Sequence, residues 1–309
     1  MIKDKVVILG ASGFIGMHLC KKLNDKNFEV ISIIRNKKSE NYQELLKIGV
    51  KIIDVGNLFE KKKIKNNFSD IKYLVNLAAL AHVNNKKYFN KNLNYEYMNN
   101  IEKNIVRNFK NKELRIIHLS SAKVSKYNSS DKTEYAKVKK KAEEIIRKNY
   151  KNHIILRPPL VYGPYVKANF LLLMKAIQNN LPLPFKKILK KRSYMYVENL
   201  VDAIYFLLKT NYFKGKTYEI SDNCTITNEK LATTIANNLG KKVFLFYLKP
   251  EIFSYIFKFF GINDIFNKMM KEFIVNNKKF ISDTGWKPPY HYTEGIKKTC
   301  LWYKRTFRM

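Results

Sequence analysis

The chain begins with a short apolar run that leads directly into three glycines: residues 5–16 read KVVILGASGFIG. The aliphatic run predicts a buried strand, and the apolar stretch that follows predicts a helix over residues 15–26. Between them, Gly10, Gly13 and Gly16 have the spacing GxxGxxG. Glycines let a backbone approach a diphosphate closely, and a helix N-terminus binds its charge. The stretch therefore predicts the phosphate-binding turn of a dinucleotide-binding fold, with a glycine turn of no function as the alternative.

Strands and helices are expected to alternate through the first half of the chain. Apolar β-type runs occur at Val6–Leu9, Glu29–Ile34, Lys51–Asp54, Tyr73–Leu77, Arg115–Leu119 and Ile154–Leu156. Amphipathic stretches separate them at residues 15–26, 41–48, 94–110 and 134–148. Strands separated by helices are typical of a doubly wound parallel sheet. We therefore predict an α/β fold of the Rossmann type, with residues 1–164 as an NAD(P)-binding domain.

The character of the sequence changes after Arg157, which is followed by two prolines. Prolines mark loops from here on, and helices mixed with short strands are expected at residues 167–179, 198–209, 228–239, 251–271 and 293–306. No low-complexity linker separates the two halves. We predict that residues 165–309 form a smaller, mixed α/β substrate lobe, some of whose segments return to the Rossmann domain.

The chain is strongly basic. Its 309 residues include 59 Lys and Arg against 25 Asp and Glu, a formal net charge of +34. The cations are spread over all segments without a nucleic-acid-binding signature, which favours lysines on solvated faces over a specific nucleic-acid surface. The charge still suits an anionic substrate such as a nucleotide diphosphate. Weak attraction to an anionic membrane surface, aided by the apolar and basic segment 252–271, is an alternative.

Cysteine and histidine are too few and too scattered to form a framework. Cys20, Cys224 and Cys300 make no close pair, and the five histidines have no paired ligand spacing, so neither disulfides nor a metal site is expected. No apolar stretch reaches the roughly 18 residues of a membrane span. We expect a cytoplasmic protein, with peripheral association at the inner membrane face as the alternative.

The ends of the second and third expected strands bear on the choice of cofactor. NAD-binding proteins of this fold usually place an acid after the second strand, whereas this chain has Arg35 there. An arginine suits a 2′-phosphate, which slightly favours NADP over NAD, unless Arg35 is one more surface cation. Asp54 either accepts from the adenine amine or starts a loop. The expected contacts in the glycine turn itself are Gly10, Ser12, Gly13, Phe14, Ile15 and Gly16.

A tyrosine and a lysine follow a strand that ends in two serines. Ser120 and Ser121 close the expected fifth strand, and Tyr135 and Lys139 lie further on in an expected helix. Four residues apart on a helix, the two side chains share a face. A nearby ammonium favours the phenolate, which makes Tyr135 a candidate general acid or base. Ser121 could hydrogen-bond the same substrate oxygen.

The YxxxK spacing by itself is weak, because it recurs at Tyr205–Lys209 and at Tyr212–Lys216. Only the copy at Tyr135 follows a strand-ending serine after the appropriate number of αβ units. This context favours a catalytic group at Tyr135 over a solvated Tyr–Lys pair.

Together these motifs resemble the extended short-chain dehydrogenases/reductases, the NAD-dependent epimerase/dehydratase family. The likeness rests on the glycine turn, the paired serines, YxxxK, and the segments LAA (77–79), RPPLVYGP (157–164), LPLPF (181–185) and VENLVDAI (197–204). It is similar in particular to the bacterial branch of UDP-glucose 4-epimerase-like enzymes and UDP-N-acetylquinovosamine dehydrogenases, which are 4-ketoreductases.

The resemblance implies a homodimeric enzyme of polysaccharide biosynthesis that transfers a hydride at C4 of a UDP-linked hexose or N-acetylhexosamine. Tyr135 would exchange a proton with the C4 oxygen, Lys139 would bind the nicotinamide ribose, and Ser121 would orient the substrate. Carried over residue by residue, the resemblance also implies cofactor contacts at Leu77, Ala78, Ala79 and Asn94, and substrate contacts at Asn169 and Arg192. An arginine suits a diphosphate because its guanidinium binds phosphate oxygens through two donors.

The chain departs from the family pattern near the expected sugar pocket. Many relatives read Tyr-Gly after Val124, whereas this chain reads Ser125-Lys126. Epimerase and net reductase therefore both stay open. The residues after Ser121 are Ala122 and Lys123, with no carboxylate, which disfavours the elimination that dehydratases perform. The alternative of another class is a non-catalytic, dinucleotide-binding Rossmann protein with a basic surface for RNA or membranes.

Overall fold

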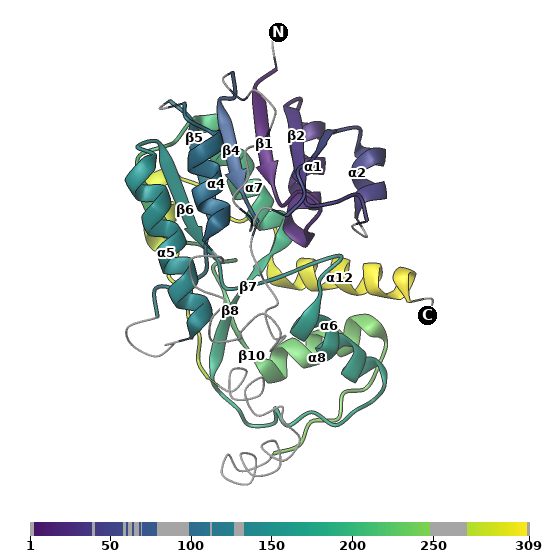
Figure 1. Cartoon of the computed structure of the whole chain (residues 1–309). Helices are drawn as coiled ribbons and strands as arrows, with labels where there is room; N and C mark the ends of the chain where they lie inside the picture. Colours follow the sequence, from purple (N-terminus) through teal and green to yellow (C-terminus); the bar gives the residue numbers. More distant parts are fainter. Residues whose placement is uncertain are drawn as a thin grey trace. The chain divides into compact units, whose positions relative to one another are not determined.

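The computed structural model describes residues 3–38, 41–57, 60, 64, 68, 70–78, 99–111, 113–126, 133–247 and 271–307. The chain divides into two compact units. The first consists of residues 1–158, 200–220 and 278–287, and the second of residues 159–199, 221–277 and 288–309. Figure 1 labels most of the elements of both.

A seven-stranded parallel sheet forms the centre of the first unit (Figure 1). Its strand order is β3-β2-β1-β4-β5-β6-β9. The strands are β1 (Lys5–Leu9), β2 (Glu29–Ile34), β3 (Lys51–Asp54), β4 (Tyr73–Asn76), β5 (Arg115–Leu119), β6 (His153–Arg157) and β9 (Lys216–Glu219). The order reverses between β1 and β4, and in doubly wound sheets ligands bind at the carboxyl ends of the strands where this happens. A ligand site is therefore expected at the residues that follow β1, β4 and β5.

Helices cover this sheet and close its core. They are α1 (Phe14–Asp25), α2 (Tyr42–Ile48), α4 (Asn100–Asn108), α5 (Glu134–Asn149) and α11 (Lys278–Thr284), together with most of α7 (Val197–Thr210). Alternate strand residues such as Leu74 and Ile116 share one buried cluster with Ile101 and Ile105 of α4 and Ile146 of α5. The spacing of four between the two α4 isoleucines puts both on the helix face that meets the sheet.

The second unit contains a three-stranded sheet of order β10-β8-β7. Its strands are β7 (Leu160–Tyr162), β8 (Lys191–Tyr196) and β10 (Thr225–Thr227), and its helices are α6 (Ala168–Gln178), α8 (Asn228–Leu239) and α12 (Tyr292–Thr306). Helix α8 packs against both α6 and α12. A Cβ on Gly295 of α12 would lie 2.6 Å from Tyr162 Oη and 2.8 Å from the Tyr196 ring, so this helix lies against the two tyrosines because the position is glycine.

The predicted fold class is confirmed, since a parallel Rossmann-type sheet with flanking helices is accompanied by a small mixed sheet. Strand β9 had no counterpart in the sequence pattern, and it extends the main sheet beside β6. The predicted helix at 251–271 lies almost wholly outside the described residues, as does the first part of the helix predicted at 94–110. None of the helices in the described part of the chain is long and apolar enough to cross a membrane.

Candidate active site

The glycine turn connects β1 to the first residue of α1. Gly10 has a φ of +79°, in the region that glycine enters readily, and its amide donates to Ile33 O on β2 at 3.3 Å. Gly13 is the N-cap of α1, and within the described residues no side chain caps this end. A Cβ on Gly16 would lie 2.2 Å from Gly10 O, so α1 starts this close to the turn only because the position is glycine.

This turn fits the diphosphate of a dinucleotide. The first amides of a helix lack partners within the helix and attract anions. The first turn of α1 has no acidic residue that would repel a phosphate. The predicted contacts Ser12, Phe14 and Ile15 lie in this same stretch and are half-buried. The turn thus has both the backbone geometry and the local charge that an anionic ligand requires.

The other predicted cofactor residues follow the strands next to the turn. The Leu77 amide, just after β4, donates to Leu9 O at 3.0 Å, and the Ala78 amide donates to the Asn76 side chain at 3.1 Å. Leu77 and Ala78 therefore lie beside the glycine turn, where a Cβ on Gly10 would be 2.9 Å from the Ala78 amide. Ala79 and Asn94 lie outside the described residues.

Arg35 and Asp54 lie where the sequence placed them, at the ends of β2 and β3. Both are exposed. One carboxylate oxygen of Asp54 accepts from the Gly56 amide at 3.1 Å, which is the bond that an aspartate makes at the start of a turn. The geometry thus shows the loop-starting use of Asp54 directly, and adenine recognition stays a prediction.

Lys139, Tyr135 and Ser121 lie around the place where β5 ends and α5 begins. Lys139 is buried, and its ammonium donates to Leu119 O, at the end of β5, at 2.9 Å. Tyr135 is half-buried one turn earlier on α5, and the Lys123 ammonium lies 5.6 Å from the centre of its ring. The Lys123 amide in turn donates to Ser121 Oγ at 3.3 Å. Ser121 is therefore linked to the Tyr135 ring through Lys123, and Leu119, whose carbonyl accepts from the Lys139 ammonium, lies two residues before Ser121 in the chain.

Asn76, Glu102 and His118 form a buried polar cluster close enough to Lys139 to be affected by its charge. Asn76 Nδ2 donates to Glu102 Oε1 at 3.3 Å and lies 3.0 Å from His118 Nδ1. Burial raises the pKa of Glu102 to about 7, although the Lys139 ammonium opposes this rise. Burial also lowers the pKa of His118 well below its usual value, and the charges of Lys139 and Arg147 add to this effect. The cluster therefore holds a neutral imidazole near the lysine ammonium.

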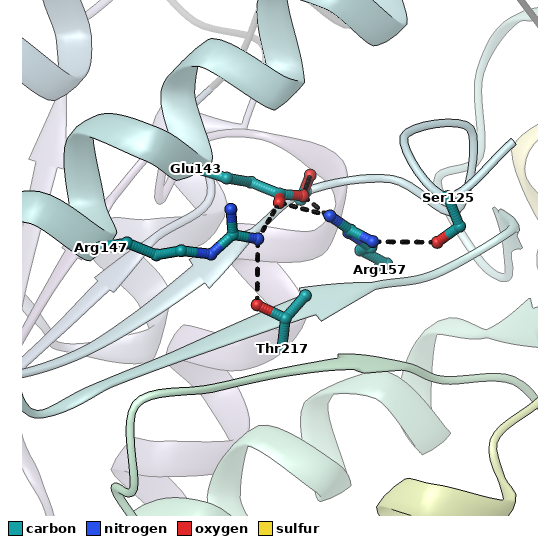
Figure 2. A network of polar contacts seen from close by, with 6 residues as sticks. Ser125, Glu143, Arg147, Arg157 and Thr217 are labelled. Carbon is teal, nitrogen blue, oxygen red and sulfur yellow. Dashed lines mark hydrogen bonds and ion pairs between the residues drawn. The ribbon is translucent and has the colours of Figure 1, made fainter. Parts of the chain in front are cut away.

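A second network surrounds the fully buried carboxylate of Glu143 on α5. Arg157, at the end of β6, donates to its two oxygens at 2.8 and 2.6 Å, and Arg147 donates to one of them at 2.5 Å. Figure 2 shows both guanidinium groups turned toward Glu143, with Arg147 also donating to Thr217 on β9. Removing one partner of a buried charge pair costs about 3–5 kcal/mol, because the other charge is left uncompensated. The network therefore joins α5, β6 and β9 at the end of the sheet where Ser121 lies.

Sequence reasoning missed Asn76, Glu102, His118, Glu143 and Arg157. A sequence signal was present for three of them. The asparagine and the histidine interrupt apolar strands that were expected to be buried, and a polar residue at such a position needs a partner. The glutamate at 143 lies four residues after Lys139 and so shares its helix face. The identity of the partners was not readable, because they come from distant parts of the chain.

Two of the three predicted substrate residues, Asn169 and Arg192, belong to the second unit, whereas Ser121 belongs to the first. Asn169 is exposed in the first turn of α6. Arg192 lies on β8, where its guanidinium donates to Lys271 O and lies 5.6 Å from the centre of the Phe273 ring. Burial lowers the pKa of Arg192. The structure thus presents both residues in one unit, and their contacts with a substrate stay predictions.

Asp222 is a buried acid of the second unit. It accepts from the Tyr196 amide at 2.9 Å and from Asn199 Nδ2 at 2.8 Å. Burial raises its pKa to about 6.

In the described part of the chain, no group of three or more His, Cys, Asp or Glu side chains is placed to hold a metal ion.

The parallel sheet, its strand reversal and the glycine turn define a dinucleotide-binding protein of the Rossmann class. Within that class the chain belongs to the NAD dependent epimerase/dehydratase family, whose model matches residues 6–221. It is thus an enzyme of the epimerase/dehydratase type, and the non-catalytic alternative is not favoured.

Individual relatives match along nearly the whole chain. UDP-glucose 4-epimerase from Vibrio cholerae is 26% identical over 316 residues, which cover 95% of this chain and 94% of that protein. The structure of UDP-N-acetylglucosamine 4-epimerase from Methanobrevibacter ruminantium, in complex with UDP-N-acetylmuramic acid, matches with a TM-score of 0.73 and 21% identity, covering 99% of this chain and 100% of that chain. The Bordetella bronchiseptica enzyme WbmF, in complex with NAD+ and UDP, has a TM-score of 0.76 and 15% identity, covering 99% of this chain and 94% of that one. At these identities the two structures show the shared fold.

Proposed function

We propose that the protein is an NAD(P)-dependent C4 oxidoreductase of nucleotide sugars, either a 4-epimerase or a 4-ketoreductase of a UDP-hexose or UDP-N-acetylhexosamine, in polysaccharide biosynthesis. The observation that carries the proposal is the grouping of Ser121, Tyr135 and Lys139 where β5 ends and α5 begins, in a chain of the epimerase/dehydratase family. Relatives described as UDP-sugar 4-epimerases support the choice of substrate and carbon.

In the proposed reaction, the Tyr135 hydroxyl exchanges a proton with the C4 oxygen of the sugar. The Lys123 ammonium lies 5.6 Å from the centre of the Tyr135 ring, and Lys139 follows one turn later on α5. The Ser121 hydroxyl holds the same oxygen by a hydrogen bond and keeps it within reach of the phenol. A bound nicotinamide would supply or accept the hydride at C4.

For the cofactor, we propose that the glycine turn and the α1 N-terminus hold the diphosphate and that Lys139 binds the nicotinamide ribose. WbmF, with NAD+ bound, supports NAD, whereas the exposed Arg35 after β2 still supports NADP. Titration of the purified protein with each dinucleotide compares the two directly. An Arg35→Asp variant is expected to lose affinity for NADP and keep or gain affinity for NAD.

For the substrate, we propose that Arg192 binds the diphosphate of the UDP group and that Asn169 contacts the same part of the molecule. The strongly positive chain favours such an anionic ligand overall. Formation of a homodimer and peripheral contact with an anionic membrane belong to the same proposal, and size-exclusion chromatography and liposome sedimentation measure them.

The central test replaces Tyr135 by phenylalanine, which removes only the hydroxyl. Purified protein is assayed with UDP-hexoses and UDP-4-keto sugars in the presence of NAD(H) or NADP(H). We expect Tyr135→Phe to lower kcat by at least about a hundredfold, the usual contribution of a positioned general acid or base. Tyr205→Phe is the matched control, because Tyr205 has the same YxxxK spacing and packs edge-on against Phe28. Full turnover in Tyr135→Phe would contradict the proposed role of the Tyr135 hydroxyl.

The same assay separates the two reactions. A 4-epimerase returns an epimer without net consumption of dinucleotide, whereas a 4-ketoreductase consumes one reduced dinucleotide for each sugar. Product sugars are identified by chromatography, and the dinucleotide is followed by its absorbance.

A further inference from the structure

Glu143, which is fully buried, and Arg157, which is half-buried, form an ion pair beside the loop that leaves β5. Ser120 Oγ donates to Glu143 Oε1 at 2.5 Å, and Arg157 donates two hydrogen bonds to the same carboxylate. Arg157 also donates through Nη1 to Ser125 Oγ at 3.1 Å, the contact drawn in Figure 2. Ser120 and Ser125 flank residues 121–124, which we call the loop. Glu143 and Arg157 therefore hold the loop at both of its ends.

The loop is also held in its middle. The Ala122 amide donates at 2.9 Å to the carbonyl of Pro158, the residue that directly follows Arg157. The loop bears the Ser121 hydroxyl and the Lys123 ammonium, which lies 5.6 Å from the centre of the Tyr135 ring. Whatever fixes the loop therefore fixes both groups relative to the phenol.

We propose that Glu143 and Arg157 are positioning residues, which set the places of Ser121 and Lys123 relative to Tyr135 through the loop. The inference rests on the proposed function, because the reaction is what gives these positions a use. Ser125, at which the chain departs from the family pattern, is the residue through which Arg157 holds the far end of the loop in this protein.

Stability alone is a weak reason for such a network. Replacing a buried ion pair by well-packed apolar residues is often neutral or favourable, because taking the charges out of water is costly. What a fully satisfied polar network does provide is a unique local geometry. Reacting groups need such support, since an error of about 1 Å in their placement can lower a rate by about a hundredfold.

Ser125→Ala is the first variant to make. Ser125 is exposed, so the protein should fold normally, while the loop loses its bond to Arg157. We expect kcat to fall by about tenfold, with KM changed by less than about twofold and dinucleotide affinity unchanged. Ser282→Ala is the matched control, an exposed serine on α11 that bonds to Lys279 O, and it should behave as wild type.

A double-mutant cycle with Ser121→Ala separates positioning from general damage. If Ser125 acts through the loop that bears Ser121, the double variant should lose little more activity than Ser121→Ala alone. If Ser125 merely supports the fold, the two losses in kcat should multiply. Multiplying losses would overturn the part of the proposal by which Ser125 places Ser121.

A second readout does not depend on activity. Hydrogen exchange of the backbone amides of residues 119–126 should be faster in Ser125→Ala and in Glu143→Gln than in wild type and in Ser282→Ala. Unchanged exchange of the loop in Ser125→Ala would overturn the positioning role even if no sugar were turned over. Wild-type protein that lacks activity on every nucleotide sugar but shows the exchange effect would refute the proposed function and support the loop's dependence on the pair.

Discussion

At the scale of single residues, Glu102 is an acid that the fold keeps from water. The residue is 4% exposed, and burial raises the pKa of its carboxyl group to about 7, against 4.5 for the free group, while Lys139 and Asn76 oppose the rise. The folded state therefore holds this proton more tightly than the unfolded chain does. The stability from this group is fully present below about pH 4.5 and is lost as the pH rises through about 7.

Glu102→Gln should remove this dependence on pH. From this group alone, the wild-type free energy of unfolding should fall by up to about 3 kcal/mol between pH 4.5 and pH 8, because each pKa unit corresponds to about 1.4 kcal/mol. The variant should have a flatter profile and gain stability relative to wild type at pH 8. Urea unfolding at several pH values measures this. Glu144→Gln, which removes only an exposed pair with Lys141, should follow the wild type. Parallel profiles for wild type and Glu102→Gln would contradict the assignment.

At the scale of elements, the start of α1 depends on a backbone approach that side chains forbid. A Cβ on Gly16 would also lie 2.7 Å from Ala11 Cα, so an alanine there must move the helix or the turn. The amides that we assign to the diphosphate would move with it.

Gly16→Ala should therefore weaken dinucleotide binding by at least about tenfold, since several hydrogen bonds to charged oxygens are each worth about 1.5–3 kcal/mol. Calorimetric titration measures the affinity. Gly49→Ala is the control: this C-cap of α2 has a φ of +77° and open space around it, so alanine should cost about 1 kcal/mol of stability and leave the affinity unchanged. Equal affinities in Gly16→Ala and wild type would show that the turn does not hold the ligand.

Strand patterns allowed the first unit to be predicted closely. The expected runs at Glu29–Ile34, Lys51–Asp54 and Arg115–Leu119 match β2, β3 and β5 residue for residue. Strands β2 and β5 are short apolar segments buried in a parallel sheet, which is the case where composition alone is informative, whereas β3 is exposed at both of its ends. The helix expected at 228–239 likewise matches α8, whose Thr227 cap and terminal Gly240 are local signals.

Long-range partners were not predictable. Periodicity reports which face of an element is apolar, and it does not report which distant segment covers that face. For this reason β9 was missed, although it pairs with β6 more than 50 residues before it in sequence. In the candidate site, the YxxxK context predicts Tyr135 and Lys139, whereas the contacts of Glu143 with Ser120 and Arg157 needed coordinates.

At the scale of the whole molecule, the net charge of +34 must oppose the folded state through self-repulsion. The repulsion acts between solvated groups, and salt screens it over a distance of about 10 Å at 0.1 M. Exposed lysines such as Lys3, Lys190 and Lys230 lie on both units and contribute to it.

The Tm should therefore rise as sodium chloride is increased from about 20 mM to about 300 mM, by roughly 2–4 °C for each kcal/mol of relieved repulsion. Calorimetry or differential scanning fluorimetry measures this. A variant with these three lysines replaced by glutamine should be more stable at low salt and show a smaller rise. A Tm that falls with added salt would mean that favourable ion pairs outweigh the repulsion.

The division of the chain has a consequence for its synthesis. The first unit needs residues 200–220 and 278–287 in addition to its N-terminal part. A nascent chain that has only just passed Pro158 leaves the edge of β6 uncovered until Lys216–Glu219 emerge from the ribosome. During translation, the edge of β6 therefore stays unpaired while about sixty further residues are synthesised. A chaperone could bind this exposed strand edge during that interval.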